Sequence, residues 1–288
     1  MKDYLICTDS ASDLSPELLA EWGVGFRSLT FRFDDEDKEY SNQEMSAPVF
    51  YSKMRAGGIA KTAAVNTESF REMFEQILKE GKDVLYLGFS SGLSTTYNSA
   101  RLAGLALAEE YPDSKIITVD TLCASAGQGL LLYHVLEKKK AGATIEEAAQ
   151  YAKDLVPSLC HWFTVDDLVY LKRGGRISPA AAFVGNLIGI KPVLHVDDEG
   201  HLVNVEKVRG RRASIMTMAS KYGELSLDKE GSTIFISHAD CKADAELLAK
   251  TINERYGATV KIITNVGPVI GAHSGPGTLA LFFVGKYR

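Results

Sequence analysis

Cysteine is scarce in this sequence, and the four cysteines show no regular spacing. Cys7, Cys123, Cys160 and Cys241 are scattered through 288 residues, with no C-x-x-C pair and no histidine at metal-ligand spacing. Disulfide scaffolds and zinc sites both place cysteines at short, regular intervals. We therefore expect four buried thiols, no disulfide and no metal site.

The chain also lacks an excess of positive charge and any long apolar run. Its 32 Lys and Arg residues face 37 Asp and Glu residues, which leaves a formal net charge of -5 and no basic field for nucleic acid or an anionic membrane surface. Neither a signal-peptide pattern nor an apolar segment of bilayer length is present. The expectations are a cytoplasmic location, no nucleic-acid partner and no integral membrane segment.

Strand and helix patterns alternate through the first half of the chain. Thr144 and Glu147 form a capping box for one of the helices. Strands that alternate with helices form parallel sheets through right-handed crossovers. The predicted fold class is α/β, with a three-layer α/β/α domain and a mainly parallel sheet over residues 1–157. The predicted strands are 4–8, 26–33, 84–89 and 116–119, and the predicted helices are 16–22, 67–80, 95–110, 125–140 and 145–155.

The pattern changes after Val156-Pro157. Because no internal repeat and no low-complexity linker is present, we expect the two halves to pack closely and to leave a ligand site between them. The second half indicates an α+β domain with a mixed sheet over residues 158–288. Its predicted elements are a helix from Ser178 through Leu187, a hairpin of strands 191–196 and 202–208, and strands 233–237 and 259–263 around a helix over 243–256.

The segment Thr264–Gly277 places one histidine, His273, between an apolar strand and a Gly/Pro-rich turn. We expect this turn to lead to a helix. Glycine and proline fix turns whose backbone N–H groups can face a ligand. A histidine beside glycines is equally often a structural residue, so the segment by itself leaves both roles open.

A second chemistry-bearing loop follows the predicted strand 84–89. Gly88–Gly92 matches G-x-S-x-G, and Ser90, Asp240 and His273 occur in the chain order of an α/β-hydrolase triad. No HGGG-type oxyanion segment lies upstream, however. Five hydroxyl residues between positions 90 and 96 suit an anion held at a helix N-terminus, although serines that merely cap the helix are the structural alternative.

Three further loops carry polar or cationic residues. The loop 61–67 has hydroxyl groups just before a helix. Tyr170–Ile177 surrounds a Gly pair with three cations, and Arg209–Arg212 adds another cationic turn. Cations at a helix end can compensate its dipole, but they can also contact a phosphate or an anionic partner.

The ordered set of motifs is similar to that of the DegV family. The motifs are Thr8-Asp9-Ser10 with Asp13-Leu14, Phe89–Ala100, Val119-Asp120-Thr121, Tyr170–Ile177, Ile190-Lys191-Pro192 and Gly267–Gly277, and together they extend over essentially the whole chain. The resemblance implies a long-chain fatty acid in a tunnel between two domains, no cofactor, and a role as the B subunit of a bacterial fatty-acid kinase. Such a protein presents the acyl carboxylate to a separate ATP-binding catalytic subunit, holds the acyl phosphate, and is not itself the enzyme. A serine hydrolase and a lipid-sensing regulatory protein remain the alternatives.

The resemblance also assigns site residues. It places carboxylate binding on Thr62, Ser94 and His273, with a partner-facing cationic residue at Arg173. The loop that begins at Thr62 differs from the family pattern T-S-Q-P-S, because it reads Thr62-Ala63-Ala64-Val65-Asn66. This difference bears on the tunnel mouth and on acyl preference. The supporting loop residues are Ser91, Gly92, Thr95, Gly271 and Ala272, the further docking residues are Arg209 and Arg211, and the expected tail lining is 183–188, Ile270 and 279–283.

Overall fold

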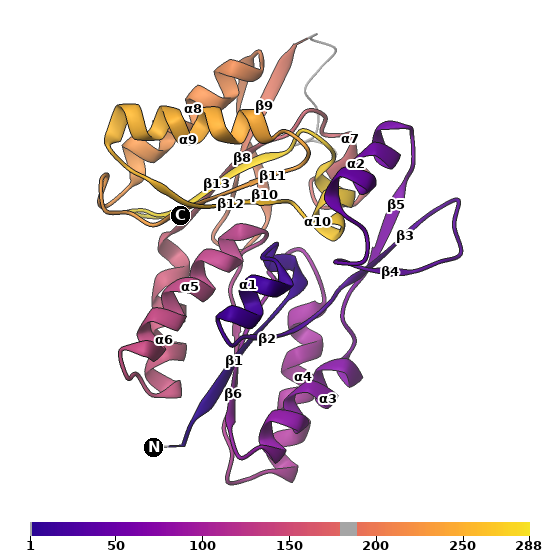
Figure 1. Ribbon diagram of the computed structural model, residues 1–288, viewed down its shortest axis with the longest axis vertical. Coiled ribbons are helices and arrows are strands. Elements are labelled where there is room, and N and C mark those ends of the chain that lie inside the picture. Colours follow the sequence, from indigo (N-terminus) through magenta and orange to yellow (C-terminus); the bar gives the residue numbers. More distant parts are fainter. Residues whose placement is uncertain (1, 179–188) are drawn as a thin grey trace.

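The computed structural model describes residues 2–178 and 189–288, which form two main sheets (Figure 1). The first sheet is parallel, and all six residues of its strand β6 are buried, because a central parallel strand is covered on both faces. The predicted strands 4–8, 84–89 and 116–119 are confirmed to within one residue. In the order β2-β1-β6-β7, the strands are Gly25–Arg27, Tyr4–Asp9, Asp83–Gly88 and Ile116–Asp120.

Helices cover both faces of this sheet, as predicted for a three-layer α/β/α arrangement. Successive residues of β6 point to opposite sides, so Val84 and Tyr86 enter one core while Leu85 and Leu87 enter the other. The first core is completed by α3 (Thr67–Lys79) and α4 (Thr96–Glu110), and the second by α1 (Pro16–Glu21), α5 (Ala126–Lys140) and α6 (Ile145–Leu155).

The capping box before α6 is confirmed. Thr144 N donates to Glu147 Oε2 at 2.8 Å, and Glu147 N donates to Thr144 Oγ1 at 3.2 Å. Two of the N–H groups that every helix leaves unpaired at its start are therefore satisfied by side chains.

The predicted single strand 26–33 is wrong. Residues 25–27 form β2, whereas Thr30–Phe33 form β3 of a separate three-stranded antiparallel sheet. The chain leaves the first sheet at Leu29, whose N–H donates to Ser10 Oγ at 2.9 Å instead of to a neighbouring strand. The small sheet has the order β4-β3-β5, with β4 at Tyr40–Ser41 and β5 at Ala60–Ala63, and α2 (Ala47–Arg55) lies between these two strands in the chain.

The second main sheet is mixed, as expected for the α+β half of the chain. All of its neighbouring strands are antiparallel except β11 and β12, and the predicted hairpin is the pair β9 and β10. In the order β10-β9-β8-β13-β11-β12, the strands are Leu202–Arg209, Ile190–Val196, Leu159–Thr164, Leu279–Val284, Ile234–His238 and Val260–Asn265.

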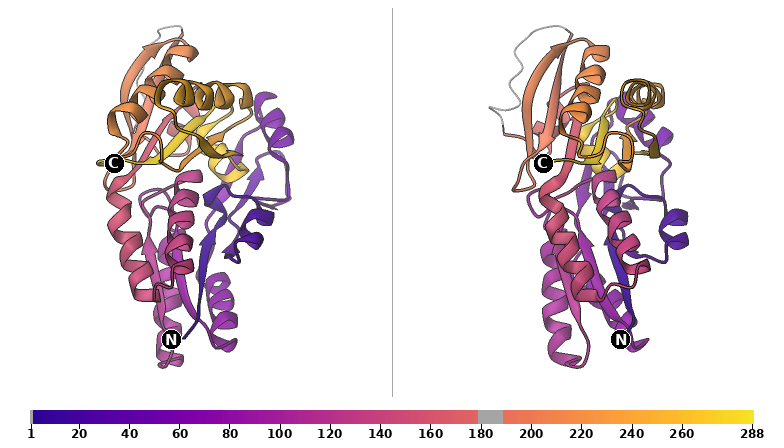
Figure 2. Two further views of the ribbon diagram at one scale, coloured as in Figure 1. Left: turned by 60° about the vertical axis from the view of Figure 1, so that its left-hand side comes forward. Right: turned by 90° about the vertical axis from the view of Figure 1, so that its left-hand side faces the viewer.

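The two faces of the second sheet have different covers. The helices α8 (Arg211–Leu225) and α9 (Lys242–Tyr256) pack on one face, where β13 contributes Leu279, Leu281 and Phe283. On the other face, Ala280 and Phe282 belong to the same core as α5 and α6. One apolar core therefore connects the two sheets, which lie one beyond the other along the long axis of the molecule (Figures 1 and 2). The proposed division at residue 157 stays a prediction.

His273 lies inside a helix, which corrects the expected local structure. Pro268 is the first residue of α10 (Pro268–Ser274), and the segment Gly275–Gly277 ends this helix and leads into strand β13 instead of into another helix. Gly275 and Gly277 have φ of 82° and 81°, a backbone conformation that favours glycine. Proline at a helix start and glycine past its end are the ordinary asymmetry of helices.

Three other expectations concern the cysteines, the segment 178–188 and membrane-spanning helices. The cysteines are all free, but only three are buried, because Cys241 lies at the partly exposed start of α9. The predicted helix from Ser178 through Leu187 and the tail-lining segment 183–188 lie outside the described residues, except for Ser178 itself. Within residues 2–178 and 189–288, no helix combines the length and the apolar character that crossing a membrane requires.

Candidate functional site

A cavity of about 460 Å³ lies between the second sheet and the carboxyl edge of the first. Loops at the carboxyl edge of parallel strands are the usual ligand site of such sheets. Much of the lining is apolar and comes from both halves of the chain, including Phe89, Leu93, Phe163, Val196, Leu202 and Phe282. The cavity therefore offers a ligand a largely apolar surface.

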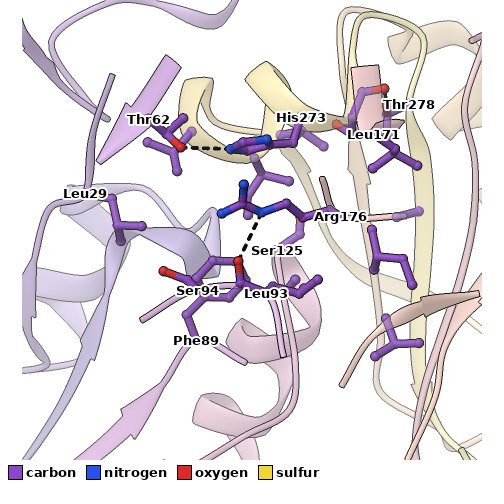
Figure 3. A pocket seen from close by; sticks show the side chains of 18 of the residues that line it. Leu29, Thr62, Phe89, Leu93, Ser94, Ser125, Leu171, Arg176, His273 and Thr278 are labelled. Atoms are coloured by element: carbon purple, nitrogen blue, oxygen red, sulfur yellow. Dashed lines mark hydrogen bonds between the residues drawn. The ribbon is translucent and has the colours of Figure 1, made fainter. Parts of the chain in front are cut away.

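One part of the cavity carries a group of polar side chains (Figure 3). Thr62 on β5 and His273 on α10 face each other, with 2.8 Å between Thr62 Oγ1 and His273 Nε2. Ser94, from the loop before α4, and Arg176 lie beneath this pair in the view of Figure 3. We call Thr62, Ser94, Arg176 and His273 the polar end. The structure thus brings the three predicted carboxylate-binding residues to one cavity.

The histidine of the polar end is neutral near pH 7. Burial lowers the pKa of His273 to about 4, and the positive charge of Arg176 acts in the same direction. A neutral imidazole can donate from one ring nitrogen and accept at the other. His273 therefore supplies a hydrogen bond at the polar end and no charge.

Arg176 supplies the positive charge of the polar end. Its Nε donates to Leu93 O at 3.1 Å and its Nη1 donates to Gly174 O at 2.5 Å, and burial lowers the pKa of its side chain. No carboxylate pairs with Arg176 within the described part of the chain. A partly buried cation with free donors is suited to bind an anion.

Sequence reasoning placed Arg176 in a cationic motif but chose Arg173 as its functional residue. The structure separates the two side chains. Arg173 is exposed at the end of α7 (Val169–Arg173), with its guanidinium 5.7 Å from the centre of the Tyr170 ring. Gly175, with φ of 70°, then turns the chain so that Arg176 lines the cavity. The Gly pair between the two arginines was the available signal for this change of direction.

The loop before α4 combines hydroxyls that bond within the protein with hydroxyls that line the cavity. Ser94 Oγ lies 2.9 Å from Thr96 Oγ1 and accepts from Thr96 N at 3.2 Å, so it helps to begin the helix. Ser91, Ser94 and Thr95 all line the cavity. Ser94 therefore both helps to begin α4 and lines the cavity, and anion binding by this loop stays a prediction.

A further hydroxyl in the cavity was not assigned from the sequence. Ser274 is buried, lines the cavity, and its Oγ has no hydrogen-bond partner. Its position directly after His273 in the Gly267–Gly277 motif was the available signal. Ser274 adds a free hydroxyl to the cavity wall.

Three predicted supporting residues act through packing. A Cβ on Gly92 would lie 2.8 Å from Glu199 O, and a Cβ on Gly271 would lie 2.4 Å from Tyr51 Oη. Both glycines therefore permit a close approach of backbone to the neighbouring segment. Ala272 is buried in the core that includes α3 and α4. Each of the three adjoins a cavity-lining residue in the chain, and their supporting role stays a prediction.

The helix that carries His273 is held at its first turn. Gly267 N donates to Asp13 Oδ1 at 2.9 Å, and Val269 N donates to Asn42 Oδ1 at 2.8 Å. These side chains satisfy N–H groups that the helix itself cannot pair. The Asp13-Leu14 motif thereby fixes the position of His273 from a distance.

The two remaining cationic residues differ in their surroundings. Arg209, at the end of β10, is exposed. Arg211 Nε lies 2.8 Å from Asp244 Oδ2, and its Nη1 lies 3.9 Å from Asp166 Oδ1. Arg211 is therefore engaged by carboxylates of this chain, whereas Arg209 presents its charge to solvent.

The hydrolase arrangement is not formed. Ser90 is fully buried, and its Oγ donates to Gly200 O at 2.9 Å, which fastens the turn of the β9–β10 hairpin. Asp240 Oδ2 lies 3.1 Å from Arg55 Nη2, and His273 is hydrogen-bonded to Thr62. No hydrogen bond joins any two of Ser90, Asp240 and His273. In the described residues, no group of three or more His, Cys, Asp or Glu forms a candidate metal site.

The fold and the cavity define an α/β protein that can enclose an apolar ligand with one anionic end. The family model described as "Uncharacterised protein, DegV family" matches residues 4–286. A DegV domain-containing protein of Clostridium perfringens is 43% identical over an alignment of 289 positions, which covers 100% of this chain and 99% of that protein. The chain belongs to the DegV family.

Solved structures agree with this assignment. A DegV lipid-binding protein from Thermotoga maritima has a TM-score of 0.86 and 30% identity, with 99% of both chains covered. A structure that describes fatty acid binding by a DegV family protein from Thermus thermophilus has a TM-score of 0.87 and 28% identity, with 99% of this chain and 100% of that chain covered. The predicted DegV-like fold is confirmed.

Proposed function

We propose that this protein binds a long-chain fatty acid in the cavity, with the carboxylate at the polar end and the tail along the apolar lining. The observation that carries the proposal is Arg176, a cation without a carboxylate partner in the described chain, beside three hydrogen-bonding side chains in a mostly apolar cavity. An ionised carboxylate enters such a site only where charge and donors replace its water.

The balance of energies separates the roles of head and tail. Burying about fifteen methylenes at about 0.8 kcal/mol each gives roughly 12 kcal/mol of gross stabilisation, from which the costs of association are subtracted. A charged hydrogen bond contributes about 1.5 to 3 kcal/mol. The tail therefore determines most of the affinity, and the polar end fixes the orientation of the acid.

The lipid-binding DegV proteins of Thermotoga maritima and Thermus thermophilus support the same ligand class for this chain. The proposal includes a two-domain organisation, residues 1–157 and 158–288, with the ligand between the domains. The cavity lining, which comes from both ranges, supports this division.

We further propose that the protein is a carrier and not the enzyme. It presents the carboxylate to a separate fatty-acid kinase and holds the acyl phosphate that results, which places it in the cytoplasm with ATP. The exposed cations Arg173 and Arg209 support a docking surface for an acidic partner, because surface charges chiefly steer association. Arg211 contributes less to such a surface, since Asp244 and Asp166 compensate its charge.

The test is to denature the purified protein, extract it with organic solvent and identify released lipids by mass spectrometry. A near-stoichiometric long-chain fatty acid is the expected result. A protein that releases none and also fails to take up added octadecanoic acid would contradict the binding role. For the carrier role, Arg173→Ala should bind the acid normally but slow its ATP-dependent phosphorylation by a fatty-acid kinase, and a normal rate would remove Arg173 from docking.

A further inference from the structure

Helix α4 presents two leucine side chains to solvent. One side of the helix is buried on the first sheet, whereas on the other side Leu102 is 44% exposed and Leu105 is 56% exposed. Residues three apart on a helix share one face, so the two leucines lie side by side, next to the exposed Ala106. Contiguous exposed apolar surface is typical of interaction sites. The outer face of α4 is therefore a candidate contact surface.

Two charges of opposite sign flank Leu105. Arg101 lies four residues before it and Glu109 four residues after it, and both are exposed. The guanidinium of Arg101 bonds to Asn98 Oδ1, through Nε at 3.3 Å and Nη2 at 3.0 Å. In residues 2–178 and 189–288, neither Arg101 nor Glu109 has an ion-pair partner, whereas the neighbouring Glu110 pairs with Arg71. The face thus carries one free charge of each sign at equal distances from its central leucine.

This arrangement of charges makes the face complementary to itself. A two-fold axis through Leu105 brings α4 of a second copy against α4 in the antiparallel direction, so each residue before the centre faces one after it. Arg101 of each copy then faces Glu109 of the other copy, and Leu105 packs on Leu105. A parallel arrangement would instead place Arg101 against Arg101 and Glu109 against Glu109. The charges therefore select the antiparallel pair.

The open edge of the first sheet lies beside this helix. Strand β7 is the outermost strand and, in the described part of the chain, pairs only with β6. Helix α4 packs directly on β7, because a Cβ on Gly104 would lie 3.0 Å from Ile116 Cγ2. An open strand edge is a usual place for contact between chains. Two leucines and their flanking charges cover less than the roughly 800 Å² that each partner of a standard interface buries, so we expect a weak, concentration-dependent association.

We propose that this protein forms a two-fold dimer in which α4 packs antiparallel on α4 of a second copy, with Leu105 at the axis and Arg101 paired with Glu109 across it. The dimer leaves the cavity free. Thr95, which lines the cavity, directly precedes α4, and Leu105 is ten residues further along, about 15 Å on a helix. The starts of two antiparallel helices point away from each other, so each copy keeps its own ligand site.

The test is sedimentation equilibrium from micromolar to millimolar protein, in which the native chain should change from monomer to dimer. Arg101→Glu alone, or Glu109→Arg alone, places like charges opposite each other and should weaken the dimer by about tenfold. The two single variants mixed in equal amounts should associate as tightly as the native protein, because opposite charges face each other again in the mixed pair. The double variant Arg101→Glu with Glu109→Arg should recover the native affinity for the same reason.

A substitution at the axis tests the apolar part of the contact. Leu105→Glu brings two carboxylates together at the centre and should abolish the dimer. Leu227→Glu is the matched control, since Leu227 is 64% exposed in the turn between α8 and β11, and this variant should dimerise like the native protein. Both substitutions are at exposed positions and should leave the fold intact, which circular dichroism checks.

A covalent trap tests the position of the axis separately. Leu105→Cys should form a disulfide between two copies under mild oxidation, because residue 105 meets itself at a two-fold axis, and Leu227→Cys should cross-link far more slowly. A native protein that stays monomeric at every concentration would overturn the inference. A dimer that Leu105→Glu or the charge reversals leave unchanged, or mixed variants that fail to associate, would overturn it as well, since the contact would then lie elsewhere.

Discussion

The pH dependence of unfolding should isolate Asp13, the residue that fastens α10. Its Oδ1 accepts from Gly267 N at 2.9 Å and its Oδ2 accepts from Ser125 Oγ at 2.5 Å. Burial, partly offset by these hydrogen bonds, raises the pKa of Asp13 to about 7 from its ordinary value of 3.8. The neutral carboxyl is therefore the form that the fold favours.

The sign of the effect follows from proton binding. Between about pH 4 and pH 7 the folded state holds a proton on Asp13 that the unfolded state has lost, so stability falls as pH rises. Over this range, each rise of one pH unit lowers the free energy of unfolding by about 1.4 kcal/mol. From pH 5 to pH 8, Asp13 should lower the free energy of unfolding by roughly 3 kcal/mol, and the loss should level off above pH 7.

Asp13→Asn provides the measurement, because an amide keeps an oxygen that accepts from Gly267 N and cannot ionise. Urea unfolding of both proteins is followed at pH 5, 6, 7 and 8. The free energy of unfolding of the variant, relative to that of the native protein, should rise by about 1.4 kcal/mol for each pH unit up to pH 7. A stability difference that is constant with pH would refute the raised pKa and the reasoning built on it.

Three further predictions address the site and its supports. Arg176→Gln should weaken binding of octadecanoic acid by tenfold to about a hundredfold in calorimetry, because a charged hydrogen bond is lost, whereas His273→Gln should cost less than about tenfold, since that imidazole is neutral. Equal losses in the two variants would contradict this division of roles. Ser90→Ala should lower the free energy of unfolding by about 1 kcal/mol without affecting acid binding, and the native protein should not react with a fluorophosphonate; labelling at this serine would restore the hydrolase alternative. Gly271→Ala should destabilise the protein by about 1 to 3 kcal/mol through overpacking against Tyr51, and the cost should be smaller in a Tyr51→Phe background; an unchanged cost there would place the clash elsewhere.

Much of the first half could be predicted because local signals and tertiary structure agree there. The apolar run of β6 is buried on both faces, and the capping box of α6 is local chemistry that needs no partner. The prediction of one strand over 26–33 was wrong because this apolar run is divided between two sheets. The small sheet that holds Thr62 was missed altogether, since its strands have two to four residues and little periodicity.

The site was predictable only in part. Thr62, Ser94 and His273 line one cavity, as the family resemblance implied, although their roles stay predictions. The prediction for the segment around His273 was wrong because Gly-Pro pairs stand both at the start of α10 and just after its end. The pattern alone does not show which pair begins the helix and which follows it. Arg176 was missed because the direction of its side chain depends on the backbone turn at Gly175, and the Gly pair indicates a possible turn without showing which arginine it directs into the cavity.

The measurement that tests the central claim most directly is nuclear magnetic resonance of octadecanoic acid labelled with carbon-13 at its carboxyl carbon. Bound to the native protein, it should give one resonance of an ionised carboxylate that persists below the pH at which the free acid protonates, because Arg176 stabilises the charge. In Arg176→Gln the bound acid should protonate at higher pH, while Arg173→Ala should leave its titration unchanged. The absence of a bound resonance, or a titration that Arg176→Gln does not alter, would contradict the account.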